Sequence, residues 1–256
     1  MRRTTVRRTV LAASAVSLAL LVTACGSDEP AAKDKPKAEA SKSAPAAAPA
    51  AKALSQAEVD KLMLTQSDLP RHKINPATKA DFAAAKAASA DRKECAPLVD
   101  GMALRGTGDA AASSVRKVIA IPENPGKDAT EEEKLAAAME TLSGTITADT
   151  VASYEGQGAA DTLAAIKKAG TDCGSGFTML VGTDKLKFTK VAPAAYPAGD
   201  EAVNFALTVD MEGKPGNAYL TAVRKGGTVA TFYALSLAGK SELPKAVIDA
   251  QVKKLG

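Results

Sequence analysis

The sequence predicts an α+β fold in which a twisted antiparallel sheet of about five to six strands carries helices on one face, with one disulfide. Helical patterns dominate the part of the chain before Cys173, whereas short runs rich in Val, Phe, Thr and Tyr follow it. Helices followed by strands are typical of an α+β layer. Two cysteines are available for the disulfide.

The helices are predicted from their end signals and from apolar spacing. Ser55 precedes Glu58 by three residues, which is the spacing of a capping box at a helix start. Thr130 begins another helix, over residues 130–142, whose acidic first turn suits the positive end of a helix dipole. The remaining helical segments are alanine-rich or amphipathic and cover residues 82–90, 161–169 and 243–255.

The strands are predicted from β-branched and aromatic runs that end at turn residues. One strand covers residues 114–121 and stops at Pro122. Five more follow Cys173, at residues 177–181, 186–191, 202–209, 218–224 and 229–237. Short loops between successive strands indicate an antiparallel meander, and Gly226-Gly227 is typical of a hairpin turn.

The first 24 residues have the features of a lipoprotein signal peptide. Arg2, Arg3, Arg7 and Arg8 precede an apolar stretch that is too short for a membrane-spanning helix, which needs roughly 20 residues. The stretch ends in Val22-Thr23-Ala24-Cys25, which fits a lipobox. We expect Cys25 to carry a lipid anchor in the membrane. An ordinary secreted signal is the alternative, and export by the general secretory or the twin-arginine route stays open.

Residues 25–53 are rich in Ala, Pro, Lys and Ser and have almost no large apolar side chain. Such a segment cannot bury enough surface to offset the entropy of ordering, and its prolines interrupt helices. We interpret it as a disordered tether between the lipid and a single domain at residues 54–256. The protein is therefore expected on the outer face of the cytoplasmic membrane.

Removal of the signal peptide changes the charge of the protein. The whole chain has 33 Lys and Arg residues against 29 Asp and Glu residues, and a formal net charge of +4. All of this excess lies before Cys25, so the mature chain is formally neutral. It has no basic cluster with interleaved aromatic residues, and nucleic acid is not expected as a partner.

Cys95 and Cys173 form an even pair in an oxidising compartment, which predicts a disulfide between them. It closes a loop of roughly 80 residues, worth about 4 kcal/mol by loop entropy. The two cysteines are not a CxxC pair, and His72 is the one histidine of the sequence, so a zinc site is not expected.

The sequence shows no catalytic machinery. Ser114 and Lys117 match the S-x-x-K spacing of penicillin-binding proteins, but they lie in a predicted strand, which would send them to opposite faces. We interpret His72 as a solvated loop residue rather than a general base. No phosphate loop or dinucleotide fingerprint occurs. We therefore expect a protein that is not an enzyme and has no cofactor or metal.

Several short motifs resemble one family. Beside the lipobox and the tether, they are Ser67-Asp68-Leu69-Pro70, Cys95, Asp172-Cys173-Gly174-Ser175-Gly176-Phe177 and Gly199-Asp200-Glu201-Ala202. Together they resemble actinobacterial lipoproteins related to the extracellular sensor domain of PknH-type kinases. The resemblance implies helices and a twisted antiparallel sheet around a central cleft that binds an unknown extracellular ligand. Members often have two disulfides, whereas this chain has cysteines for one.

The expected function is noncatalytic ligand binding or sensing by an anchored domain, with a small molecule or an envelope protein as partner. One alternative is a carrier of lipid or another apolar molecule, with a deep cavity on the inner faces of the late strands. Another is a structural interaction protein with an exposed apolar patch. Asp200 and Glu201 either solvate the entry to a strand or stand at the rim of a ligand cleft.

Overall fold

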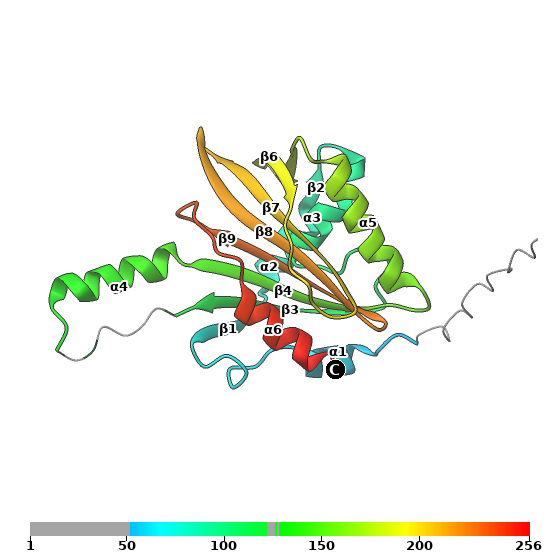
Figure 1. Cartoon of the computed structure of the whole chain (residues 1–256), viewed down its shortest axis with the longest axis horizontal. Coiled ribbons are helices and arrows are strands. Elements are labelled where there is room, and N and C mark those ends of the chain that lie inside the picture. Colours follow the sequence, from blue (N-terminus) through cyan, green and yellow to red (C-terminus); the bar gives the residue numbers. More distant parts are fainter. Residues whose placement is uncertain (1–51, 122–125, 127) are drawn as a thin grey trace, which may run out of the picture. The chain divides into compact units, whose positions relative to one another are not determined.

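The computed structural model describes residues 52–121, 126 and 128–256, and within this part the strands form one antiparallel sheet of nine strands (Figure 1). Their order across the sheet is β1-β3-β4-β9-β8-β7-β6-β5-β2. The strands span His72–Pro76 (β1), Ala88–Ala90 (β2), Ala112–Ala120 (β3), Thr145–Ser153 (β4), Phe177–Val181 (β5), Asp184–Pro193 (β6), Glu201–Met211 (β7), Lys214–Lys225 (β8) and Thr228–Ser236 (β9).

Six α-helices and one short 3₁₀ helix lie in the same described part. They span Gln56–Leu62 (α1), Lys79–Ala87 (α2), Lys93–Cys95 (η1), Ala96–Met102 (α3), Glu131–Ser143 (α4), Gly158–Asp172 (α5) and Lys245–Lys254 (α6). The predicted capping box is confirmed at α1, where Glu58 bonds back to Ser55. α4 follows Thr130 as predicted, and the structure adds a capping box there, in which Glu133 bonds back to Thr130.

The predicted sheet of five to six strands with helices on one face is wrong. The sheet has nine strands, and helices cover both of its faces (Figure 1). On one face, Leu98 of α3 and Leu163 of α5 pack in a core with Leu220 of β8. On the other, Val59 of α1 and Ile248 of α6 pack in a second core with Phe232 and other side chains.

The meander from β5 to β9 is confirmed, with each strand beside the next and a hairpin at Gly226. Three strands were missed. β4 is central but carries Asp149 in its middle, and β1 begins at His72, which the sequence places in a loop. β2 is a three-residue strand at the end of the segment predicted as a helix.

The disulfide between Cys95 and Cys173 is confirmed. It links η1 to the end of α5 across 78 positions of sequence, and both cysteines are fully buried. The signal peptide, Cys25 and nearly all of the predicted tether lie outside the described residues, so these predictions remain untested.

Candidate functional site

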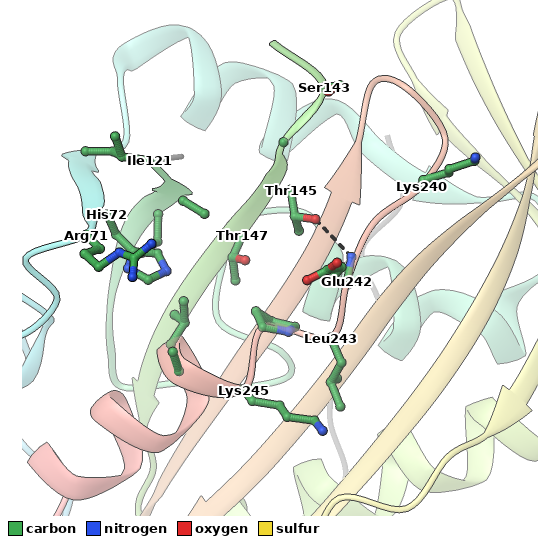
Figure 2. A pocket seen from close by; sticks show the side chains of 16 residues that line it. Arg71, His72, Ile121, Ser143, Thr145, Thr147, Lys240, Glu242, Leu243 and Lys245 are labelled. Atoms are coloured by element: carbon green, nitrogen blue, oxygen red, sulfur yellow. Dashed lines mark hydrogen bonds between the residues drawn. The ribbon is translucent and has the colours of Figure 1, made fainter. Parts of the chain in front are cut away.

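The larger of two cavities has a volume of about 860 Å³ (Figure 2). It lies on the sheet face that α1 and α6 cover, which we call the α1/α6 face; the opposite face, covered by α3 and α5, is the α3/α5 face. β1, β3 and β4 form the floor of the larger cavity, and the segment between β9 and α6 forms one wall. The lining comprises Arg71, His72, Val118, Ala120, Ile121, Ser143, Gly144, Thr145, Thr147, Lys240, Glu242, Leu243, Pro244, Lys245, Ala246 and Val247.

The floor of the cavity follows from the strand register. His72 pairs with Ala120, and Val118 pairs with Thr147, so these side chains lie in successive rows on one face. Val118 and Val247 also belong to the α1/α6 core, which places the cavity where that core ends. Helices α1 and α6 thus leave this part of the sheet face open to a ligand.

The wall between β9 and α6 is fixed by hydrogen bonds to neighbouring strands. The backbone N–H of Glu242 donates to Thr145 Oγ1 at 2.9 Å. Asn217 on β8 donates from Nδ2 to the carbonyl of Ser241 at 2.7 Å, and the Ser241 hydroxyl donates to the carbonyl of Asn217 at 2.5 Å. These contacts hold Glu242 above the start of β4, where its carboxylate points towards the cavity (Figure 2).

The opposite wall carries Arg71 and His72. The prediction of a solvated loop residue is wrong for His72, which begins β1 and buries its Nδ1 atom without a hydrogen-bond partner among the described residues. Burial lowers the pKa of its imidazole, and the charge of Arg71 lowers it further. The imidazole is therefore neutral at neutral pH, and the charge on this wall comes from Arg71.

Asp149 lies on β4 two residues beyond Thr147, on the same sheet face and completely buried. It pairs in register with Arg116 and Phe232, yet neither carboxyl oxygen has a hydrogen-bond partner among the described residues. Burial raises the pKa of this carboxyl well above its ordinary value, against the opposing charge of Arg116. A carboxyl group whose protonated form is favoured by burial therefore lies in the core next to the cavity floor.

The smaller cavity, of about 330 Å³, lies between α3 and α5 on the other face of the sheet. Asp100, Thr107 and Asp161 are among its lining residues. The Tyr154 hydroxyl donates to the carbonyl of Thr107 at 2.7 Å, and Asp100 forms an ion pair with Arg105. Two of its polar groups, the Tyr154 hydroxyl and the Asp100 carboxylate, thus already have partners within the protein.

Asp200 and Glu201, the candidate cleft-rim residues, lie at the start of β7. Asp200 accepts a hydrogen bond from the Gly226 N–H at 2.8 Å and lies 3.6 Å from both Arg224 and Lys225. The hydrogen bond and the two cations lower the pKa of its carboxyl. Glu201 lies 3.9 Å from Arg224. They line neither of the two cavities, and a role at a cleft rim stays a prediction.

Ser114 and Lys117 lie on strand β3, as expected from the sequence, and Lys117 pairs with Asp81 at 2.6 Å. Within the described ranges, no group of three or more His, Cys, Asp or Glu side chains could hold a metal ion. In the same ranges, no helix combines the length and the apolar character that a bilayer span requires.

No protein-family model matches this chain, and no curated protein matches it in sequence. Its fold is similar to the crystal structure of the extracellular domain of PknH from Mycobacterium tuberculosis, with a TM-score of 0.45 and 9% identity. The similarity covers 80% of this chain and 96% of that chain. A likeness this distant carries no argument about function, so we base the proposals on the geometry of the cavity.

The cavity residues were not found from the sequence. They come from four separate parts of the chain, near positions 71, 120, 145 and 243, and only the sheet topology brings them together. The helix predicted over residues 243–255 lies beside one wall, but α6 begins only at Lys245, so residues 243 and 244 belong to the wall and not to the helix. The opposite wall lies at strand β1, and β1 has too few apolar residues to be recognised as a strand from the sequence.

Proposed function

We propose that the protein is a lipid-anchored extracytoplasmic domain that binds a small molecule noncatalytically in the cavity over β1, β3 and β4. The cavity carries this proposal: its volume of about 860 Å³ is within the range of ligand pockets, roughly 300–1,000 Å³. Half of its sixteen lining residues are polar or charged, so it is more polar than the mostly apolar lining of many ligand pockets and suits a polar ligand.

The anchoring part of the proposal is supported by the lipobox before Cys25 and by the composition of residues 25–53. Two or more acyl chains give the stable attachment that one chain does not. The disulfide between Cys95 and Cys173 agrees with an oxidising compartment outside the cytoplasm.

The noncatalytic part of the proposal is supported by the surroundings of His72. A general base needs a partner that orients its imidazole, and the buried Nδ1 of His72 has no such partner among the described residues. The groups that converge on the cavity are suited to holding a ligand.

The carrier alternative is not favoured by the position of the cavity. A carrier was expected to hold its cargo on the inner faces of the late strands. There, Phe177, Phe188 and Phe205 are buried, and the rings of Phe177 and Phe188 stack at 4.9 Å between centroids. These side chains fill the space that an apolar cargo would need.

One observation favours a second function, the binding of an envelope protein. Of the five large apolar side chains that are exposed in the described part, Leu135 and Met139 lie one turn apart on α4. α4 lies beyond the end of the sheet (Figure 1). If so, a protein that crosslinks to the wild type in cells should no longer crosslink when Leu135 and Met139 are both replaced by serine. An unchanged set of crosslinked proteins would exclude this function.

Native mass spectrometry of the protein purified from its own envelope tests ligand binding. Ala120 is exposed in the cavity, so Ala120→Trp should fill the cavity without disturbing the core. Ala164→Trp, at an exposed position of α5 that lines neither cavity, is the matched control. A co-purifying molecule should be retained by the wild type and the control and lost from Ala120→Trp. Equal retention by both variants would contradict the proposal.

A further inference from the structure

The smaller cavity, between α3 and α5, is lined by charges of one sign. Three carboxylates reach it, from Asp100 on α3, from Asp109 in the loop before β3 and from Asp161 in the first turn of α5. No Lys, Arg or His side chain is among its described lining residues. The cavity therefore offers negative charge and hydrogen-bond acceptors to a molecule that enters it.

One of the three carboxylates is already paired within the protein. Arg105 donates from Nε to Oδ1 of Asp100 at 3.0 Å, and its Nη2 contacts the same oxygen. Arg105 also donates to backbone carbonyls of α2 and β2. Because this ion pair is formally neutral, the negative charge left for a ligand belongs to Asp109 and Asp161.

Asp109 and Asp161 are available to a ligand. Both residues are exposed, and neither carboxylate has a hydrogen bond or an ion pair within the described part of the chain. They come from a loop and a helix that are about 50 positions apart in sequence, and the fold brings both to one cavity. Two unpaired carboxylates in one cavity repel each other, and a cation bound between them would reduce this repulsion.

A buried hydroxyl in the same lining indicates a ligand independently of the charges. Thr107 is only 4% exposed, and its Oγ1 atom has no hydrogen-bond partner among the described residues. Its backbone carbonyl, by contrast, accepts the hydrogen bond from Tyr154. Buried polar groups nearly always have a partner, so an unpartnered hydroxyl in a cavity wall is a contact that a ligand with N–H donors can complete.

The arrangement of these acceptors suits an organic cation better than a metal ion. Among the described residues, no three His, Cys, Asp or Glu side chains converge enough to hold a metal. An ammonium or guanidinium group has several N–H donors and can bond to acceptors that lie farther apart. Ala96, Pro97 and Ala165 add an apolar part to the lining, which a hydrocarbon chain can contact. The volume of about 330 Å³ limits the ligand to a small molecule.

We propose that the smaller cavity binds a small organic cation, an alkyl amine or guanidine, with its charged head at Asp109 and Asp161 and its hydrocarbon chain on the apolar part of the lining. The site lies on the opposite face of the sheet from the larger cavity. The inference therefore goes beyond the proposed function and does not depend on it.

Isothermal titration calorimetry of the mature protein tests the inference with n-butylamine and n-butylguanidine, and with n-butanol as the neutral analogue. The two cations should bind at least about tenfold more tightly than the alcohol, because only they have a charge for the carboxylates to contact. Their affinity should fall as the salt concentration rises. Equal binding of the alcohol, no binding of either cation, or tighter binding of calcium ions than of both cations would overturn the inference.

Two aspartate variants test the position of the charged head. Asp109→Asn and Asp161→Asn should each weaken binding of both cations by about tenfold, because each removes one charged acceptor. Asp184→Asn, at an exposed position that lines neither cavity, is the matched control and should bind both cations as the wild type does. Wild-type affinity in both Asp109→Asn and Asp161→Asn would overturn the assignment.

A threonine variant separates a ligand contact from a structural role. Thr107→Val removes the hydroxyl and nearly keeps the shape of the side chain. It should weaken binding of both cations without lowering the melting temperature of the free protein, because the hydroxyl has no partner there to lose. Unchanged binding together with a lower melting temperature would show a structural role and contradict the contact.

Tryptophan substitutions locate the site. Ala165→Trp should fill the smaller cavity and abolish cation binding, whereas Ala164→Trp, at the neighbouring exposed position of α5, lines neither cavity and should bind as the wild type does. Ala120→Trp fills the larger cavity and should leave cation binding unchanged. Cation binding that is lost in Ala120→Trp and kept in Ala165→Trp would overturn the inference and leave the proposed function standing.

Discussion

The two faces of the sheet differ in how they are closed. On the α3/α5 face, the disulfide joins the two helical elements, and apolar side chains fill the core. On the other face, α1 and α6 are joined through a hydrogen bond from Gln251 Nε2 to the carbonyl of Leu62 at 2.8 Å. That face also contains the buried Asp149 and the larger cavity. One face is thus closed by a covalent crosslink and an apolar core, whereas the other combines an apolar core with a buried carboxyl group and open space.

The largest expected change in the free energy of unfolding follows from removal of the disulfide. Replacement of Cys95 and Cys173 by alanine should lower the free energy of unfolding by about 4 kcal/mol, because the closed loop spans 78 positions. Urea denaturation measures the total, and hydrogen exchange should show the largest loss of protection in α3 and α5. A larger loss of protection in α1 and α6 than in α3 and α5 would contradict the idea that the disulfide stabilises the α3/α5 face.

The next effect tests how tightly the α3/α5 face is packed. Gly170 of α5 faces the ring of Phe205, and a Cβ atom at this position would overlap that ring. Gly170→Ala should therefore cost about 1–3 kcal/mol. Gly101→Ala on α3 is the matched control, because its Cβ would make ordinary contact at 3.4 Å with Leu220. The control should be neutral or stabilising by up to about 1 kcal/mol in thermal unfolding. Equal effects at both glycines would indicate a looser core.

The effect that is smallest for a single pH unit concerns Asp149 on the other face. Its folded-state pKa is raised by burial, so the folded protein keeps a proton that the unfolded chain loses above about pH 4. The free energy of unfolding should then fall as the pH rises, by up to about 1.4 kcal/mol per pH unit until the folded pKa is reached. In Asp149→Asn this part of the pH dependence disappears. Urea denaturation between pH 5 and 8 measures it, and parallel profiles for both proteins would contradict a neutral Asp149.

The sequence predicted the parts of the fold that carry local signals. The capping-box spacing at Ser55 and the acidic first turn after Thr130 indicated helix starts, and the short runs rich in Val, Phe, Thr and Tyr after Cys173 indicated the meander. The cysteine count predicted the disulfide. Strand β4 escaped prediction because Asp149 and several alanine and threonine residues weaken its apolar pattern, although burial between β3 and β9 fixes it as a strand.

The larger cavity could not be predicted, because no single segment contains it. Glu242 and Arg71 are far apart in sequence and face each other only because β1 joins the sheet beside β3. Since β1 was missed, His72 was placed in a loop and its wall of the cavity was missing. The two missed strands β1 and β4 thus removed one wall and most of the floor of the cavity from the prediction.

Both outer strands of the sheet are short. β1 has five residues and ends in Pro76, and β2 has three. Exposed strand edges can pair with another chain, and short edges or proline limit this pairing. The proposed lipid anchor would bring such chains together on one membrane at high local concentration. Short edges would let such a protein cover a cell surface densely without polymerising through its own sheet.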